Sequence, residues 1–250
     1  MIDFHSHILP AIDDGADDII TALKMLKRAK RDGIDTVVST SHAYIGDESD
    51  IDKFLERRNT AYDELQKAMM ADGGDFPEIR LGAELHLKSY VGKYESVSRL
   101  AVQGTDYILL EMPYSSWNQD LYEAVYNIQV MGLKPIMAHI ERYMRFRSEF
   151  NNLKALDVLF QVNADSFTHK RMRKTLLELF YDGYIHILGS DMHNLDERKN
   201  KLKEAWEILG EKFGAGFLDF TESNAKAVLA GDKIEEMELP RLSLLNKLKL

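Results

Sequence analysis

The sequence begins with MIDFHSH (residues 1–7), whose alternation of apolar and polar residues predicts a β-strand. Alternate side chains of a strand lie on one face, so Asp3, His5 and His7 would point in the same direction. Two imidazoles beside a carboxylate are ligands that transition metals favour. The alternative is a pair of surface histidines near the chain end, and the rest of the sequence has to separate these two interpretations.

Six further apolar runs have the same strand-like character, at residues 35–42, 78–84, 106–111, 134–139, 159–165 and 184–191. Amphipathic segments typical of helices lie between them, at residues 18–33, 50–74, 119–132 and 170–183, with another at 196–214. Repeated β-then-α units in a chain of 250 residues predict a parallel sheet, closed into a barrel. We therefore expect an α/β fold that forms a single domain over residues 1–250.

Almost every strand-like run ends in a residue that can bind a metal. These residues are His7, His42, Glu84, Glu111, His139, Asp165 and Asp191, with His193 just beyond the last run. The carboxyl ends of barrel strands gather around one axis, where active sites form. The candidate metal ligands are therefore His5, His7, Asp14, His42, Glu84, Glu111, His139, Asp191 and His193. Such a set suits two or three Mn, Fe or Zn ions, whereas any single histidine could be an ordinary hydrogen-bonded group.

Composition excludes several other classes of protein. A net charge of -9 argues against a general nucleic-acid binder, because phosphate neutralisation needs a basic surface. The absence of cysteine excludes disulfides, zinc fingers and cysteine nucleophiles. No apolar run approaches the roughly 20 residues that a bilayer-spanning helix needs, so we expect a cytoplasmic protein.

The order of the motifs resembles that of a known superfamily. The motifs are DFHSHILPAIDDG (3–15), TSH (40–42), GAE (82–84), LLEMPY (109–114), AHIERY (138–143) and SDMHN (190–194). Together they resemble the polymerase-and-histidinol-phosphatase (PHP) superfamily, over residues 1 to about 230. Within it, HIERY and SDMHN with a following arginine are most similar to the metal-dependent tyrosine phosphatases encoded with bacterial capsule and exopolysaccharide genes.

The resemblance implies a distorted (β/α)7 barrel with metal ions, preferably Mn, at the carboxyl ends of its strands. One ion would bind His5, His7, Glu84 and Asp191, a second would share Glu84 and add Glu111 and His139, and a third would use Asp14, His42 and His193. Asp14 is preferred to Asp13 because its distance from the HSH motif matches the family pattern. Arg142 and Arg198 match phosphate-binding arginines of the family, since a guanidinium offers paired donors to phosphate; by sequence alone they could be surface residues.

The implied reaction is hydrolysis of a phosphotyrosine by direct attack of a metal-bound hydroxide, without the phosphocysteine route. The implied partner is the tyrosine-phosphorylated tail of the kinase that controls polysaccharide polymerisation. Three alternatives remain: a small-molecule phosphatase of the histidinol-phosphate type, a nuclease, which the acidic charge disfavours, and a non-catalytic interaction module. The sequence leaves a homo-oligomer as an alternative. The basic, apolar residues 240–250 predict a packed last helix. Peripheral contact of these residues with a membrane is the alternative interpretation.

Five other polar residues receive lesser roles. Asp3 is interpreted as a support for the ligands rather than a ligand, and His86 as a possible neighbour of Glu84. Asn163 is a candidate for substrate contact. We interpret His169 as a surface residue and His186 as a packed polar residue, and neither is assigned to the site.

Overall fold

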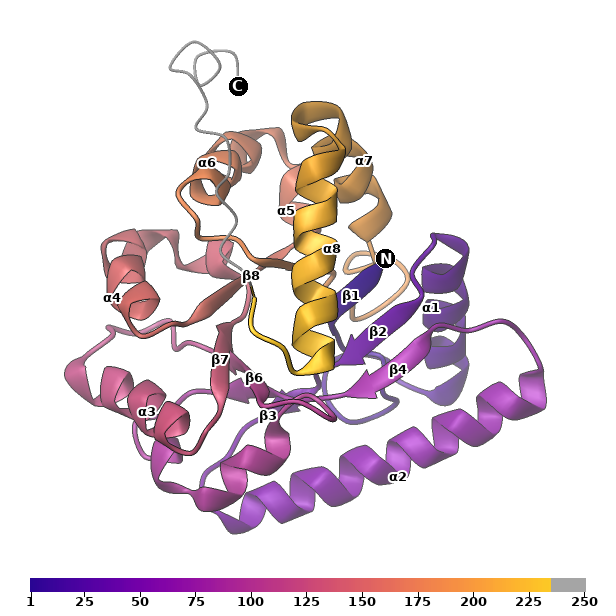
Figure 1. Ribbon diagram of the computed structural model, residues 1–250. Helices are drawn as coiled ribbons and strands as arrows, with labels where there is room; N and C mark the ends of the chain where they lie inside the picture. The colour runs from indigo at the N-terminus through magenta and orange to yellow at the C-terminus, as the bar shows by residue number, and fades with distance from the viewer. Residues whose placement is uncertain (235–250) are drawn as a thin grey trace.

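The computed structural model describes residues 1–234, in which helices surround a curled sheet of parallel strands (Figure 1). The strands are β1 (Ile2–Ser6), β2 (Thr36–Ser39), β3 (His42–Ala43), β4 (Glu78–Leu81), β5 (Glu84–His86), β6 (Tyr107–Glu111), β7 (Lys134–Met137), β8 (Leu159–Asn163) and β9 (Ile187–Gly189). They pair in the orders β1-β2-β4 and β3-β5-β6-β7-β8-β9, and each of these neighbouring pairs is parallel. The predicted α/β class with parallel strands is confirmed.

The α-helices are α1 (Ile19–Arg31), α2 (Ser49–Asp72), α3 (Gln119–Val130), α4 (Phe150–Ala155), α5 (Asp165–Thr168), α6 (Lys170–Tyr181), α7 (Leu202–Phe213) and α8 (Ala215–Ala230). Three 3₁₀ segments, η1 (Val91–Lys93), η2 (Glu95–Leu100) and η3 (Ile140–Glu149), complete the described chain. Helix α1 begins where the Asp18 side chain accepts a hydrogen bond from the Thr21 amide, and Gly73 ends α2 with a φ of 67°. No helix within residues 1–234 combines the length and the apolar character needed to span a membrane.

Two of the predicted strands are interrupted. The run at 35–42 divides into β2 and β3, and the run at 78–84 divides into β4 and β5. Gly82 lies at the second break: its amide donates to the Ser39 carbonyl at 2.8 Å, whereas its carbonyl accepts a hydrogen bond from the Arg58 guanidinium at 3.0 Å. Because that carbonyl is bound by a side chain instead of a neighbouring strand, the regular ladder stops before Glu84.

Backbone hydrogen bonds join β1 to the segment that follows β9. The His7 amide donates to the Met192 carbonyl at 2.9 Å, and the Asp191 amide donates to the His5 carbonyl at 2.7 Å. Ser6 and Met192 form a parallel bridge. The first and the last candidate ligands of the chain are therefore held side by side by main-chain bonds.

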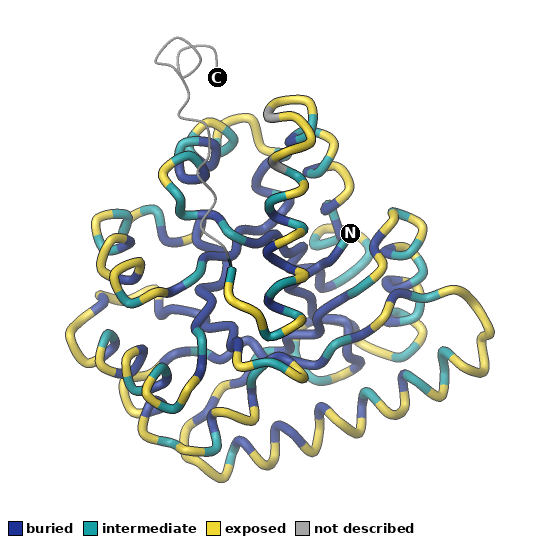
Figure 2. Tube along the Cα trace, viewed as in Figure 1, coloured by how far each residue is buried: buried dark blue, intermediate teal, exposed yellow. Residues whose placement is uncertain are grey.

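The hydrophobic core has two parts, and β6 shows how they are divided. Ile108 and Leu110 belong to a large cluster shared with most of the surrounding helices. Tyr107 and Leu109 belong to a smaller cluster that includes Ala225 and Val228 of α8. Since side chains alternate along a strand, both faces of β6 are covered, and this explains why its sequence is continuously apolar (Figure 2).

Several bounds differ from the sequence prediction. Strand β9 is confined to Ile187–Gly189 within the expected run 184–191, and α7 begins at Leu202 instead of residue 196, because 194–200 forms a loop that carries Arg198. Helices α4, α5 and α8 and the 3₁₀ segments were not expected. The proposed last helix at 240–250 lies outside the described residues.

Two glycines permit close contact with the first histidines. A Cβ atom on Gly15 would lie 2.1 Å from the His7 carbonyl oxygen, and one on Gly189 would lie 2.5 Å from the His5 Cβ. Such distances are far below van der Waals contact, so any side chain there would force the backbone apart. Both positions therefore require glycine, because β1 passes directly against them.

We predict that Gly189→Ala lowers the free energy of unfolding by about 1–3 kcal/mol, because the added methyl overpacks the contact with His5. Urea denaturation followed by circular dichroism measures this change. Gly216→Ala is the matched control: a Cβ there meets nothing within 4 Å, and alanine favours helix α8. Equal stability of Gly189→Ala and the wild type would contradict the tight contact.

Candidate metal centre

The nine predicted ligands lie together at the carboxyl ends of the strands. They are His5, His7, Asp14, His42, Glu84, Glu111, His139, Asp191 and His193, and each has a nitrogen or oxygen atom within 3.8 Å of such an atom of another member. Residues distant in sequence meet here because parallel strands deliver their last residues to the same edge. Asp165, which also ends an apolar run, lies in α5 and contacts His169 instead.

Four donor atoms form the innermost group. The Nε2 atoms of His5 and His7 lie 3.1 Å apart. The Glu84 Oε2 atom is 3.4 Å from the first and 3.5 Å from the second. Asp191 Oδ1 is 3.6 Å from His5 Nε2 and 3.4 Å from His7 Nε2. Ligands bonded at about 2.0–2.2 Å to one tetrahedral ion are about 3.3–3.6 Å apart, so the spacing of the donors from His5, His7 and Glu84 suits a shared cation, with Asp191 next to the two histidines.

Two further groups extend from the innermost one. The His139 Nε2 atom lies 2.7 Å from Glu84 Oε1 and 3.8 Å from Glu111 Oε1. On the other side, Asp14 Oδ1 lies 3.4 Å from His42 Nε2 and 3.2 Å from His193 Nε2. His42 also faces inward, since its Nδ1 atom is 2.9 Å from Glu84 Oε2. Glu84 is thus the residue around which the groups are arranged.

Two of the candidate ligands have unusual backbone angles. His139 has a φ of 35° and Asp191 a φ of 53°, in the left-handed region that residues with a Cβ rarely adopt. Each follows a strand within two residues, so the chain turns sharply where the ligand begins. The Gln161 side chain accepts a hydrogen bond from the His139 amide at 2.8 Å and holds that turn. Such strain is typical of functional sites.

Asp13 and Gln161 support the ligands, and sequence reasoning did not assign them these roles. Asp13 Oδ2 is 2.8 Å from His7 Nδ1 and also accepts from the His42 amide at 2.8 Å. Gln161 Oε1 is 3.1 Å from His5 Nδ1. The partner of one ring nitrogen fixes the orientation of the other, which here faces the cluster. The alternation of Gln161 with Asn163 in the eighth strand was the signal that could have identified Gln161.

The other five polar residues considered in the sequence have the following positions in the structure. Asp3 accepts hydrogen bonds from the Ser190 amide at 2.7 Å and the Asn200 side chain at 2.6 Å, so it supports the chain next to Asp191. His86 lies two residues after Glu84 in β5, as expected, and its Nδ1 atom is 2.9 Å from Glu111 Oε2. Asn163 donates to Asp191 Oδ2 at 2.8 Å. The expectations for His169 and His186 are met: the first side chain is 60% exposed, and the second ring stacks on Phe160.

Electrostatics keep the central carboxylates ionised. Burial alone would raise the pKa of Glu84, but the imidazoles of His5 and His139 hold it well below its usual value. Burial opposes ionisation of Asp191 too, yet His5, His7 and Arg142 hold its pKa well below the usual range. By contrast, burial raises the pKa of the neighbouring Glu141 carboxyl, which sequence reasoning overlooked, to about 8. The two central carboxylates therefore carry negative charge that a bound cation would offset.

Several buried polar atoms indicate that these residues fit a metal. Among residues 1–234, Glu84 Oε2, His193 Nε2, His42 Nδ1 and His139 Nδ1 are buried and make no hydrogen bond of regular geometry, although His42 and His193 lie close to carboxylate oxygens. Leaving such an atom unpaired costs about 1–3 kcal/mol, and more for a charged group. Three of these atoms face carboxylate or imidazole groups of the cluster, where cations would satisfy them. Imidazole and carboxylate donors together suit Mn, Fe or Zn.

Both predicted arginines reach the cluster. Arg198 Nη2 donates to both Asp191 oxygens at 3.1 Å, and its Nη1 donates to Asp14 Oδ2 at 3.2 Å. Arg142 also donates to Asp191. Their side chains are 38% and 32% exposed, so they stand between the buried ligands and solvent. This position suits recognition of an anion that also touches the cluster.

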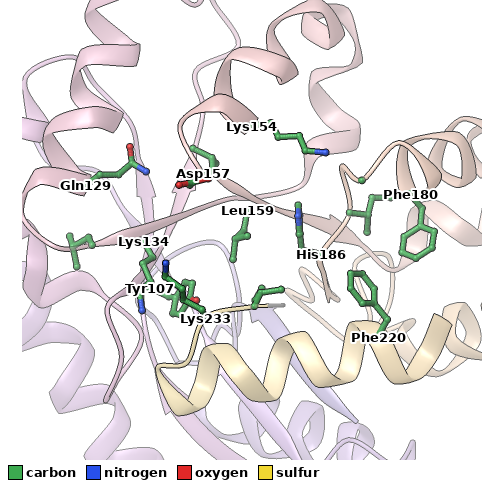
Figure 3. Close-up of a pocket in the computed structure, with 15 residues that line it drawn as sticks. Tyr107, Gln129, Lys134, Lys154, Asp157, Leu159, Phe180, His186, Phe220 and Lys233 are labelled. Carbon is green, nitrogen blue, oxygen red and sulfur yellow. The ribbon is translucent and has the colours of Figure 1, made fainter. Parts of the chain in front are cut away.

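A separate pocket of about 540 Å³ lies at the opposite ends of the strands (Figure 3). Its lining includes the first residues of β6, β7 and β8, which are Tyr107, Lys134 and Leu159. Phe220 of α8 also contributes to it. The amino ends of parallel strands lie across the sheet from the carboxyl ends, so this pocket is distinct from the ligand cluster.

A curled parallel sheet with imidazoles and carboxylates gathered at its carboxyl edge defines an α/β protein with a candidate metal centre. A family model described as capsular polysaccharide synthesis, CpsB/CapC, matches residues 1–230. The chain belongs to the CpsB/CapC family.

Relatives of known name agree with this assignment. The chain is 28% identical over 227 residues to the tyrosine-protein phosphatase CpsB of Streptococcus agalactiae, covering 86% of this chain and 91% of that protein. It is 29% identical over 242 residues to the tyrosine-protein phosphatase YwqE of Bacillus subtilis, covering 94% and 93%. A solved structure from work on YwqE and on CpsB of Streptococcus pneumoniae, described as unique metal-dependent tyrosine phosphatases, matches with a TM-score of 0.82 at 28% identity. That match covers 95% of this chain and 97% of the other.

We predict that Asp13→Ala weakens Mn²⁺ binding by roughly 10- to 100-fold, because His7 loses the group that orients its ring. Isothermal titration calorimetry of the metal-free protein with MnCl₂ measures the affinity. Asp17→Ala is the matched control, since Asp17 is an exposed acidic residue of the same loop. Unchanged affinity in Asp13→Ala would show that His7 needs no support from Asp13.

Proposed function

We propose that this chain is a metal-dependent protein tyrosine phosphatase that acts on a tyrosine kinase of capsule or exopolysaccharide synthesis. The observation that carries the proposal is the convergence of Arg142 and Arg198 on Asp191 within a cluster of imidazoles and carboxylates. A cationic rim above a polynuclear metal site suits a phosphomonoester, which has three charged oxygens to bind. Membership of the CpsB/CapC family supports the tyrosine-protein substrate.

The proposed ligand assignment has three groups: His5, His7, Glu84 and Asp191; Glu84, Glu111 and His139; and Asp14, His42 and His193. We propose two or three divalent ions. The mixed oxygen and imidazole donors suit Mn, Fe and Zn, and Mn is preferred because of the family resemblance. When bound, such ions lower the pKa of coordinated water and offset the charge of a transferring phosphoryl group.

The protein groups would act by binding and orienting the substrate. Arg142 and Arg198 would exchange their bonds to Asp191 for bonds to the phosphate oxygens, which presents the phosphorus to a water oxygen in line with the leaving group. The phosphorus–oxygen bond to the tyrosine ring breaks as the bond to the water oxygen forms, giving phosphate and tyrosine. Since a phenol has a pKa of about 10, its anion leaves more readily than an alkoxide. The chain lacks cysteine, so the route needs no phosphocysteine.

The proposal extends to the architecture. We propose a single PHP-type phosphatase domain built as a distorted (β/α)7 barrel, in which β2 with β3 and β4 with β5 each count as one interrupted strand. The bridge between Ser6 and Met192 supports closure, because it connects the first strand to the last. The proposal includes a cytoplasmic location, where the phosphorylated kinase tail would meet the enzyme.

We predict Mn²⁺-dependent hydrolysis of a phosphotyrosine peptide that exceeds hydrolysis of histidinol phosphate. Initial rates of phosphate release are measured for both substrates, with added MnCl₂ and with chelator. Chelation and the double change His5→Ala, His7→Ala should each lower the rate at least roughly 100-fold, because both remove the metal chemistry. Preference for histidinol phosphate would overturn the tyrosine phosphatase proposal in favour of a small-molecule phosphatase, and bound Mn²⁺ without hydrolysis of either would favour an interaction module.

We predict that Arg142→Gln and Arg198→Gln each lower kcat/KM for the peptide by roughly 10²- to 10³-fold, as removal of a preorganised donor to a developing charge does. Arg145→Gln is the matched control, because Arg145 lies over the Phe146 ring instead of the cluster. Its rate should stay within about twofold of the wild type. Equal losses in all three variants would argue against phosphate binding by Arg142 and Arg198.

A further inference from the structure

Two exposed tyrosines stand beside the ligand cluster. Tyr44 is 65% exposed and follows β3, while Tyr114 is 49% exposed and follows β6. Burying a large aromatic side chain away from water lowers the free energy. An exposed pair next to a functional site is therefore suited to pack against an apolar part of a ligand. The metal chemistry and the two arginines leave both tyrosines without a role.

Tyr44 lies directly against residues of the cluster. Its ring centroid is 5.3 Å from that of His42 and 5.5 Å from that of His86, which in turn contacts Glu111. The loop that carries Tyr44 is tethered at two places: the Tyr90 hydroxyl donates to the Ile45 carbonyl and the Tyr94 hydroxyl to the Gly46 carbonyl, both at 3.3 Å. Tyr44 is therefore held beside the ligands although its ring faces solvent.

Tyr114 occupies the neighbouring part of the rim. Its ring centroid is 5.4 Å from that of the buried Tyr143, whose own ring is 5.6 Å from that of His139. Tyr114 follows Glu111, the last residue of β6, by three positions. It thus lies on the side of the cluster that Glu111 and His139 form.

These contacts place two kinds of group beside one cluster. Arg142 and Arg198 both bind Asp191, and Arg198 also binds Asp14. Tyr44 contacts His42 and His86, and Tyr114 contacts Tyr143, which lies next to His139. A ligand with a phosphate at one end and an aromatic ring at the other would match both the arginines and the tyrosines.

We propose that Tyr44 and Tyr114 are the specificity-determining residues for the leaving group, and that they pack against the phenyl ring of a phosphotyrosine whose phosphate lies between Arg142 and Arg198. The inference rests on the proposed phosphatase function and names the aryl group as what this site selects. An aliphatic phosphomonoester offers no ring to the two tyrosines and gains only the contacts with the arginines. The site then binds aryl esters more tightly than alkyl esters. This preference in affinity is separate from the fact that a phenolate is a better leaving group than an alkoxide.

The test compares two non-hydrolysable ligands on the Mn²⁺-loaded protein, phenylphosphonate and methylphosphonate, by isothermal titration calorimetry. Aromatic contacts of about 0.5–1.5 kcal/mol correspond to roughly two- to tenfold in affinity. Tyr44→Ala and Tyr114→Ala should each weaken phenylphosphonate binding by that factor and leave methylphosphonate within about twofold. Tyr44→Phe and Tyr114→Phe should bind both ligands as the wild type does, because they keep the ring.

The matched control is Tyr126→Ala, a tyrosine of α3 that is 56% exposed and should leave both affinities unchanged. Equal weakening of both ligands would overturn the proposal, since it would mean that the tyrosines act only through the metal cluster. Unchanged phenylphosphonate binding in the two alanine variants would overturn it as well. Because binding is measured without turnover, failure of the phosphatase proposal itself would be seen separately, as absence of phosphotyrosine hydrolysis.

Discussion

The burial of the Glu84 carboxylate is the constraint on which the rest of the site depends. This side chain has no exposure to solvent, and imidazoles of His5, His7, His42 and His139 lie 2.7–3.5 Å from its oxygens. A buried charge costs several kcal/mol unless it is compensated. Imidazoles compensate it in part, and cations bound between them would do so fully.

The need to surround Glu84 explains irregular features of the sheet. The break at Gly82 releases the chain from the regular ladder just before Glu84, the left-handed turn at His139 directs its ring to Glu84, and that at Asp191 directs its carboxylate to His5 and His7. Gly189 lets His5 approach without a clash. The left-handed turns cost stability locally, and such strain at one end of the sheet is typical of a site selected for function.

Charged and aromatic side chains near Glu84 come from different elements of the fold. Arg142 and Arg198 bind Asp191 from the solvent side, while Tyr44 and Tyr114 are exposed on the loops after β3 and β6. Groups on loops are free to differ between relatives while the strand-borne ligands remain fixed. The chemistry of the reaction and the choice of leaving group are thereby assigned to different elements of one fold.

The α/β class, the parallel strands and the identity of the ligand candidates could be predicted from the sequence, because apolar runs that end in histidine or a carboxylate are local patterns. Asp14 and both arginines were predicted only through motif spacing. The roles of Asp13, Gln161 and Tyr44 required the tertiary structure, since each has a partner far away in the sequence: the His42 amide for Asp13, His5 for Gln161 and His86 for Tyr44. It also decided where strands break: Arg58 of α2 reaches the Gly82 carbonyl, and a competing hydrogen bond from a distant side chain has no signature within a strand's own residues.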